Sequence, residues 1–259
     1  MSPEFTALQT AMMQRALHLA ASAGNTTSPN PKVGCVIAHG EQIVGEGFHV
    51  QAGAPHAEVH ALRQAGDLAR GATAYVTLEP CSHTGKTPPC ANALIEAGVA
   101  EVICAMVDPN PQVAGQGLAR LQAASIHTAH GLLGEQAQAL NRGFLSRIQR
   151  KRPFLTLKLA ASLDGKTALA NGDSQWITGA AARADVHKER AARNAIITGS
   201  GTVLADNPQL NVRGVACLKQ PVRVVLDRHL RSPATAQIFD TSLAPTWLFT
   251  TAEQDTSAY

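Results

Sequence analysis

The sequence predicts an α/β protein of two domains, and three observations lead to this prediction. The chain has 259 residues, which exceeds the usual size of a single domain. Short apolar runs that favour strands alternate along it with amphipathic runs that favour helices, as in sheets covered by helices. Near the middle, the polar run RIQRKRP at 147–153 ends in proline and interrupts this alternation. We therefore expect one domain over residues 1–148 and a second over residues 149–259.

The first domain is predicted to be a three-layer α/β/α unit. A helical pattern covers 7–23, and two β-rich runs separated by a glycine-containing turn then predict a hairpin. Further helical patterns occupy 115–124 and 134–149. Between the hairpin and these helices the chain alternates helix and strand patterns, in the segments HAEVHALRQAG, ATAYVTLE, CANALIEAG and AEVICAMVD. The last of these is almost entirely apolar, as expected for a strand that is covered on both faces.

The second domain shows a sparser α/β pattern. We expect a strand at 154–162, FLTLKLAAS, and a helix at 178–192. Three more strands are expected in the runs NAIITG, PVRVVLD and PTWLFT. About 110 residues follow the boundary, which is the short end of the usual domain size. We therefore expect this unit to be incomplete.

Composition and charge argue against several classes of function. Lys and Arg number 22 against 19 Asp and Glu, a balance of +3 that is too small to indicate a nucleic-acid surface. No apolar run approaches the ~18 residues of a membrane span. The N-terminal run AMMQRALHLAASAG contains Arg15 and His18 and follows Glu4, which favours an amphipathic helix over a signal peptide. We expect a cytoplasmic protein with reduced cysteines that binds neither nucleic acid nor membrane.

Two segments, PHAEV and EPCSHTGKTPPC, predict a zinc site. They match the zinc-deaminase signature H-x-E followed by P-C-x-x-C, except that eight residues separate the cysteines here. The matching residues are His56, Glu58, Cys81 and Cys90. One imidazole and two thiolates leave the fourth position of a tetrahedral zinc to water, which then ionises near pH ~7. The hydroxide attacks the carbon that carries an exocyclic amine, and Glu58 moves the proton to the ring nitrogen and the leaving ammonia.

The prolines beside these ligands support their placement at helix starts. Pro55 precedes His56, and Pro88 and Pro89 precede Cys90. Proline is favoured in the first turn of a helix, and a thiol at a helix N-terminus ionises more readily. Because both helices follow strands, the two starts are expected to meet at one edge of the sheet.

Other interpretations of the same residues stay open at this stage. A structural zinc site would need a fourth protein ligand, and none is obvious. His56 and His60 have the spacing of the H-E-x-x-H metalloprotease pair, although there the glutamate directly follows the first histidine. A zinc-stabilised scaffold without turnover is a further alternative. Cys35 and Cys104 lie within apolar strands and are expected to be buried small hydrophobes, and no role is expected for Cys217.

Longer segments resemble one family in particular. The runs SPNPKVGCVI, GEGFH, PHAEVHAL, YVTLEPCSHTGKTPPC and DPNPQVAGQG resemble the deaminase domain of the bifunctional riboflavin-biosynthesis deaminase/reductases. The wide cysteine spacing is this family's own form of the signature, whereas tRNA adenosine deaminases and free-cytidine deaminases have the short form. Further along, KLAASLDGK, SQWITG and GTVLADNPQLNVR resemble the start of the family's reductase domain. The implied fold is cytidine-deaminase-like, followed by a partial dihydrofolate-reductase-like α/β domain.

The resemblance implies two activities that use Zn²⁺ and NADPH. The first domain would hydrolyse the 2-amino group of 2,5-diamino-6-(ribosylamino)pyrimidin-4-one 5′-phosphate, and the second would reduce the ribosyl group with NADPH. No Rossmann fingerprint is present, but the dihydrofolate-reductase-like fold does not need one. The family's reductase also continues with a glycine-rich cofactor loop and an acidic substrate residue that this sequence lacks. We therefore expect a fragment, or a reductase half that is inactive or serves as a scaffold.

The resemblance also assigns candidate residues, position by position. In the first domain Asn30 and His49 are the candidates for the ring and ribose of the substrate, and His83 and Lys86, in the long stretch between the two cysteines, are candidates for its phosphate. In the second domain the candidates for NADPH are Ala160, Trp176, Thr202 and Asp206. The candidates there for the substrate are Ser174, Arg190, Leu210 and Arg213. The expected partner is the small pyrimidine ribotide, and the resemblance is compatible with a homo-oligomer.

Overall fold

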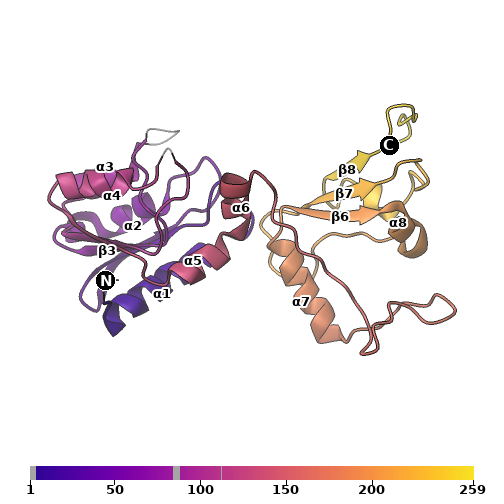
Figure 1. Cartoon of the computed structure of the whole chain (residues 1–259), viewed down its shortest axis with the longest axis horizontal. Helices are drawn as coiled ribbons and strands as arrows, with labels where there is room; N and C mark the ends of the chain where they lie inside the picture. Colours follow the sequence, from indigo (N-terminus) through magenta and orange to yellow (C-terminus); the bar gives the residue numbers. More distant parts are fainter. Residues whose placement is uncertain (1–3, 84–87, 112) are drawn as a thin grey trace. The chain divides into compact units, whose positions relative to one another are not determined.

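The computed structural model describes residues 4–83, 88–111 and 113–259 (Figure 1). The chain divides into two compact units, Met1–Leu155 and Thr156–Tyr259. Each unit has its own sheet and its own hydrophobic core.

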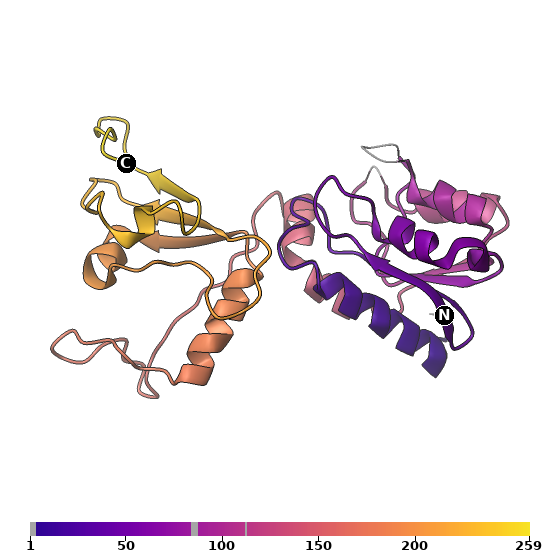
Figure 2. The same cartoon turned by 180° about the vertical axis from the view of Figure 1, so that it is seen from behind.

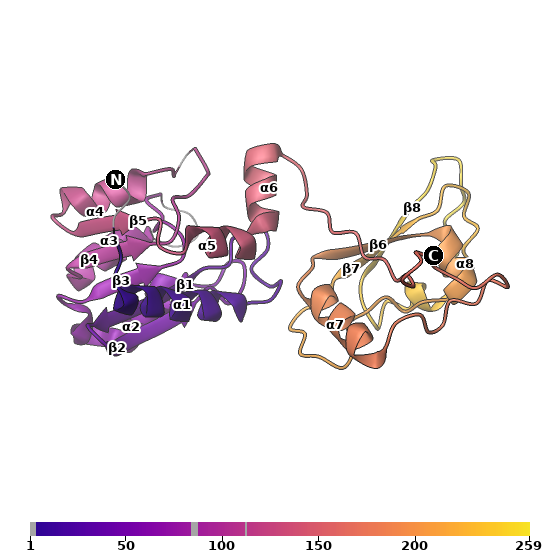
Figure 3. The ribbon, with the colours of Figure 1, turned by 60° about the horizontal axis from the view of Figure 1, so that its bottom comes forward.

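The sheet of the first unit has five strands in the order β2-β1-β3-β4-β5 (Figure 3). Strand β1 runs antiparallel to its neighbours β2 and β3, and β3, β4 and β5 are mutually parallel. The predicted hairpin is confirmed as β1 and β2. The strands are β1 Gly34–His39, β2 Gln42–Phe48, β3 Thr73–Val76, β4 Glu101–Cys104 and β5 His127–His130.

Helices cover both faces of this sheet, which confirms the predicted three layers (Figures 1 and 2). One face is covered by α2 Ala57–Ala65, α3 Cys90–Ala97 and α4 Gln116–Ala123, with the short helix η1 Gly66–Ala69 after α2. The other face is covered by α1 Ala7–Ala21 and α5 Gly134–Leu140. Helix α6 spans Arg142–Arg150.

The alternation of side chains along β1 divides the core between the two faces. Cys35 and Ile37 pack with α2 and α3, whereas Val36 and Ala38 pack with α1. Successive residues of a strand point to opposite faces, and both sets are apolar because both faces are covered. The predicted burial of Cys35 and Cys104 is confirmed.

Two elements of the first unit differ from the sequence prediction. Strand β5 was not expected, because its sequence, HTAH, is short and polar. The predicted single helix over 134–149 is two helices that meet at Asn141. The Asn141 side chain accepts a hydrogen bond from the Lys32 backbone N–H (2.8 Å) and donates one to the Lys32 carbonyl (2.9 Å). This pairing with a distant loop favours a break in the helix, since asparagine competes for backbone hydrogen bonds.

The second unit has a smaller, parallel sheet in the order β6-β7-β8. Its strands are β6 Ala195–Gly199, β7 Val222–Leu226 and β8 Thr246–Phe249, and its helices are α7 Ala180–Ala191, α8 Ser200–Asp206 and the short η2 Gln237–Phe239. Four buried residues, Val203, Val225, Ala236 and Ile238, make its core. The predicted strands in NAIITG, PVRVVLD and PTWLFT are confirmed.

The predicted strand at 154–162 is wrong. The segment is irregular and pairs with no strand of the described chain. Its leucines are exposed, and Leu157 keeps 83% of its surface accessible. Apolar alternation indicates a strand only where a neighbouring strand can take up the backbone hydrogen bonds.

Among the helices of the described residues, none combines the length and the apolar character that a membrane span requires.

Candidate functional site

Helix α2 brings His56 and Glu58 to one end of the sheet. His56 is the N-cap residue of this helix, and Glu58 lies in its first turn with only 3% of its surface exposed. The helix sits directly on β2, since a Cβ added at Gly47 would lie 2.5 Å from the His60 Cβ. This close approach requires glycine and fixes the height of α2 above the sheet.

The two cysteines reach the same place from β3 and α3. Cys81 follows the end of β3, and Cys90 is the first residue of α3, as its preceding prolines predicted. The Cys90 backbone N–H donates to the Cys81 sulfur at 3.3 Å, and the Ala91 N–H donates to the Cys81 carbonyl at 3.2 Å. The start of α3 therefore holds the loop that carries Cys81.

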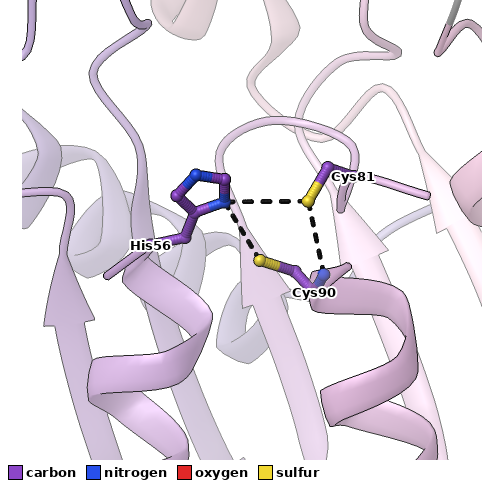
Figure 4. Close-up of side chains that lie close together, drawn as sticks. All are labelled: His56, Cys81 and Cys90. Atoms are coloured by element: carbon purple, nitrogen blue, oxygen red, sulfur yellow. Dashed lines mark hydrogen bonds between the residues drawn. The ribbon is translucent and has the colours of Figure 1, made fainter. Parts of the chain in front are cut away.

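The three side chains point toward one common centre (Figure 4). The His56 Nδ1 atom lies 3.2 Å from the Cys90 sulfur and 3.7 Å from the Cys81 sulfur. In a tetrahedral zinc site, ordinary Zn–N and Zn–S bond lengths place nitrogen and sulfur ligands about 3.6 Å apart. All three ligand atoms lie within 4.8 Å of one another, and in the described part of the chain they are the one such group. The donor set and its spacing fit zinc.

Electrostatics around this centre favour a thiolate and a protonatable carboxyl group. Hydrogen bonds from Cys90 and His56 lower the pKa of Cys81 to about 4. The hydrogen bond to Cys81 raises the pKa of Cys90, and burial raises it further. Burial raises the pKa of Glu58 to about 7, although nearby His56 opposes the shift. A carboxyl group with a pKa near the working pH is suited to both accept and donate a proton.

A cavity of ≈ 380 Å³ opens onto this centre. His56, Glu58 and Cys81 line it, together with the predicted substrate residues Asn30, His49 and His83. Lys86, the fourth predicted residue of the first domain, lies outside the described residues. A larger hollow of ≈ 700 Å³ beside α5 and α6 has none of these residues in its wall. The smaller cavity is therefore the better candidate for the substrate.

Asn30 and His49 form one hydrogen-bonded chain in the cavity wall. The His49 Nδ1 atom lies 3.1 Å from the Pro55 carbonyl, to which it can only donate. The Nε2 atom then accepts from the Asn30 amide at 3.1 Å. Burial lowers the pKa of His49, so this neutral tautomer is favoured.

Other cavity residues were not identified from the sequence. Asp108 and Asn110 follow β4, and Phe144 and Arg147 lie on α6. Arg147 also donates to the Pro29 carbonyl at 3.0 Å. The run DPNP after an apolar strand could have indicated the first pair, because carboxyl ends of parallel strands meet at one edge. No sequence signal connects α6 with this cavity.

The second unit gathers some of its candidate residues and leaves others on irregular chain. Arg190, at the end of α7, donates to the Asn211 carbonyl at 3.0 Å, and the Arg213 guanidinium donates to the Asn211 side chain. Leu210 precedes Asn211 and has a φ of +50°. Three of the four predicted substrate residues, Arg190, Leu210 and Arg213, therefore lie at or beside Asn211.

The other candidates of the second unit are less enclosed. Thr202 and Asp206 are exposed on α8. Ala160, Ser174 and Trp176 lie on the irregular chain before α7. Trp176 is 70% exposed, and the Arg183 guanidinium lies 4.4 Å from the centre of its ring.

Comparison with known proteins identifies the family. Residues 7–106 match the family described as cytidine and deoxycytidylate deaminase zinc-binding region, and residues 153–258 match the RibD C-terminal domain. The riboflavin biosynthesis protein RibD of Haemophilus influenzae is 53% identical over 268 residues, which cover 99% of this chain and 72% of that protein. The Escherichia coli RibD protein is 54% identical, and the match covers 93% of this chain and 69% of that protein. The chain belongs to the RibD family.

Solved structures of RibD proteins agree with this assignment. The Acinetobacter baumannii RibD structure has a TM-score of 0.87 at 50% identity and covers 94% of this chain and 70% of that chain. A Thermotoga maritima structure, described as a diaminohydroxyphosphoribosylaminopyrimidine deaminase/5-amino-6-(5-phosphoribosylamino)uracil reductase, has a TM-score of 0.90 at 41% identity and covers 95% of this chain and 71% of that chain.

Membership of the RibD family confirms the predicted class of enzyme and its place in riboflavin biosynthesis. The chain is a zinc-dependent deaminase joined to a reductase domain, and its cofactors are Zn²⁺ and NADPH. The predicted fold, a cytidine-deaminase-like domain followed by a reductase domain, is confirmed as well. Its substrate is a small pyrimidine compound.

Proposed function

We propose that the first unit hydrolyses the 2-amino group of 2,5-diamino-6-(ribosylamino)pyrimidin-4-one 5′-phosphate, with His56, Cys81 and Cys90 as zinc ligands and Glu58 as proton shuttle. The single observation that carries the proposal is the convergence of three ligand atoms within 4.8 Å, beside a buried carboxyl group, at the wall of one cavity. A purely structural zinc site has four protein ligands and no use for a buried carboxyl group beside them.

Glu58 carries the proton transfers in this reaction. When bound, zinc acts as a Lewis acid that makes water nucleophilic near neutral pH. Glu58 accepts a proton from the attacking water and delivers it first to the ring nitrogen. Glu58 then takes the proton of the new hydroxyl group on the ring carbon and transfers it to the amine, so that ammonia leaves, the carbonyl forms and 5-amino-6-(ribosylamino)uracil 5′-phosphate results.

The cavity wall is proposed to orient the pyrimidine ribotide. His49 is held by the Pro55 carbonyl and in turn holds the Asn30 amide, so the Oδ1 atom and the second N–H of Asn30 are fixed as hydrogen-bonding groups. His83 lies on the same wall, and Lys86 stands between the same two cysteines in the sequence. We assign the ring and ribose to the first pair and the phosphate to the second.

The second unit is proposed to reduce the ribosyl group with NADPH. Arg190, Leu210 and Arg213 would contact the substrate together with Ser174, which the grouping of the first three around Asn211 supports. The left-handed φ of Leu210 is costly for a side chain with a Cβ, and such strain is typical of functional segments. The residues assigned to NADPH are Ala160, Trp176, Thr202 and Asp206.

The remaining proposals concern the location of the protein in the cell and its binding partners. We assign the protein to the cytoplasm, in agreement with five cysteines that are all free thiols. The partner is the small ribotide alone, with no nucleic acid and no membrane, and a homo-oligomer is compatible with this assignment.

The test is ammonia release from the diaminopyrimidine ribotide by the purified chain, with zinc measured in the same sample and NADPH then added. We expect about one zinc per chain, as one three-ligand site allows, together with ammonia release, and NADPH oxidation afterwards would show that the second unit reduces the product. Bound zinc without ammonia would favour the scaffold interpretation. A chain that binds no zinc would overturn the proposal.

A further inference from the structure

Glu79 is a buried carboxylate that the proposed chemistry does not use. It stands two residues before Cys81 and keeps only 3% of its surface exposed. In the described part of the chain, no lysine, arginine or histidine forms an ion pair with it. A buried carboxylate without a cation must be satisfied by hydrogen bonds.

Four backbone N–H groups supply those hydrogen bonds. The Oε2 atom accepts from Asp108 (3.1 Å) and Gly115 (2.9 Å). The Oε1 atom accepts from Gly117 (2.9 Å) and Leu118 (3.3 Å). Three of these donors belong to the N-cap and first turn of α4, which has no side-chain cap of its own. Glu79 therefore caps α4 from outside the helix, where a negative charge is also favoured by the helix dipole.

The start of α4 also touches the backbone next to Cys81. A Cβ added at Gly117 would lie 1.9 Å from the Pro80 carbonyl oxygen and 3.2 Å from the Glu79 Oε1 atom. Pro80 is bonded directly to Cys81, so the position of α4 limits where this ligand can lie.

Arg120 makes a second connection from the same helix. Its guanidinium donates at 3.0 Å to the Ser82 carbonyl and at 3.0 Å to the Asn92 side chain. Ser82 follows Cys81, and Asn92 lies two residues after Cys90. Helix α4 thus holds the chain on both sides of Cys81 and the first turn of α3, which begins with Cys90.

We infer that Glu79 and Arg120 are positioning residues for the metal centre: together they dock α4 against the Cys81 loop and so set the distance between the two cysteine sulfurs. Glu79 also fixes the backbone of Asp108, which lines the cavity, and so connects the ligand loop to the cavity wall. This inference rests on the proposed zinc site. Groups that orient metal ligands without touching the metal commonly affect metal affinity and activity.

The test is Glu79→Gln in the full chain. An amide keeps one acceptor oxygen and turns the other into a donor, so two of the four hydrogen bonds become donor–donor contacts. We expect the dissociation constant for Zn²⁺, measured by competition with a chelator, to rise about 10–100-fold. The visible spectrum of the Co²⁺-substituted protein should change shape, and kcat for deamination should fall.

Glu46→Gln is the matched control, because it makes the same change in the same unit. Glu46 lies on β2 and pairs with Arg15 at the surface, away from the cavity residues. Its zinc affinity, Co²⁺ spectrum and kcat should equal those of the wild type. A Glu79→Gln protein that unfolds at lower temperature but keeps wild-type zinc affinity and Co²⁺ spectrum would overturn the inference, since Glu79 would then be structural only.

Arg120→Gln decides the case in which Glu79→Gln does not fold. Arg120 is exposed, so its replacement leaves the buried Glu79 contacts in place. We expect zinc affinity to weaken by about tenfold, and unchanged affinity and spectrum would overturn the inference. If the wild type itself binds no zinc, the proposed function fails. If the wild type binds zinc and both variants equal it, only the positioning role fails.

Discussion

The two units of the chain differ in how firmly their candidate residues are held. In the first unit, both faces of a five-stranded sheet are packed with apolar side chains, and two of the three proposed ligands, His56 and Cys90, start helices that rest on that core. In the second unit, four buried residues make the core of a three-stranded sheet. Helix α7 has no buried residue, and Trp176 is mostly exposed.

This difference shows what packing contributes to a site. Side chains that begin well-packed helices have their positions set before any ligand binds, as His56 and Cys90 do. Residues on irregular, half-buried chain, such as Ala160 and Ser174, have no helix or strand to set their positions, and any ordering on binding would reduce affinity. Both tryptophans of the sequence, Trp176 and Trp247, lie in the second unit. Their fluorescence therefore reports on that unit alone.

The largest expected effect is on the chemistry of the first unit. Glu58→Gln keeps the shape of the side chain but cannot carry a proton, so kcat for ammonia release should fall about 10²–10⁴-fold. Zinc content should stay at the wild-type level, and the rate of NADPH oxidation with the deaminated ribotide should not change. Loss of zinc, or deamination close to the wild-type rate, would refute the shuttle role of Glu58.

Removal of zinc should destabilise the first unit alone. A ligand present at about 1,000 times its dissociation constant stabilises the folded state by roughly 4 kcal/mol, and a chelator removes this contribution. Hydrogen exchange should therefore accelerate in α2 and α3, while the unfolding transition reported by tryptophan fluorescence keeps its midpoint. A shift of the tryptophan transition would show that the two units unfold together.

Arg223→Met should destabilise the second unit. The Arg223 side chain has 0% of its surface exposed and donates to the carbonyls of Gln209, Asp240 and Ala244. Buried carbonyls left without donors cost about 1–3 kcal/mol each, so for three carbonyls we expect a loss of at least about 3 kcal/mol in denaturant unfolding followed by tryptophan fluorescence. Arg193→Met, at a half-buried position after the end of α7 where the side chain pairs with Glu189, is the control, and an equal effect of both would contradict the prediction.

Trp176→Ala separates binding from stability in the second unit. Because the side chain is largely exposed, the free energy of unfolding should change by less than about 0.5 kcal/mol. The dissociation constant for NADPH should rise about tenfold if the indole contacts the cofactor, which corresponds to 1.4 kcal/mol. Titration with NADPH gives the dissociation constants of the wild type and of the variant, and Trp247→Phe is the control. Unchanged NADPH affinity would remove Trp176 from the cofactor site.

The smallest effect is expected at the surface of the first unit. The hydrogen bond from Arg15 lowers the pKa of Glu46 below the usual 4.5. A carboxyl group whose pKa is lowered in the folded state stabilises the protein when the pH is above the pKa of the unfolded state. This stabilisation is lost as the pH falls through the pKa of the folded state. Glu46→Gln should therefore cost about 0–1 kcal/mol at neutral pH and nothing in acid. Urea unfolding of both proteins at neutral pH and in acid tests this prediction. A larger loss of unfolding free energy in acid than at neutral pH would contradict it.

Much of the first unit could be predicted because its signals are local. The hairpin, α2 and α3 follow from alternation, from glycine and from the prolines before His56 and Cys90. Strand β5 could not be predicted, because its four residues carry little pattern and its pairing with β4 decides its structure. The prediction for residues 154–162 was wrong for the opposite reason: the segment has a strand pattern, but within the described residues it has no partner strand.

The sequence by itself determined the chemistry of this protein. The residue types His, Glu and Cys, their order and their spacing predict the metal and the proposed proton shuttle, because ligand preference is a property of each side chain, and the longer motifs indicate the family. Only the tertiary structure decided which other groups surround that chemistry. Glu79 meets α4, and Phe144 and Arg147 reach the cavity, across long stretches of chain. Such contacts depend on how the layers of the domain pack against each other. The packing is determined by all the side chains of the core together, so short sequence patterns do not predict it.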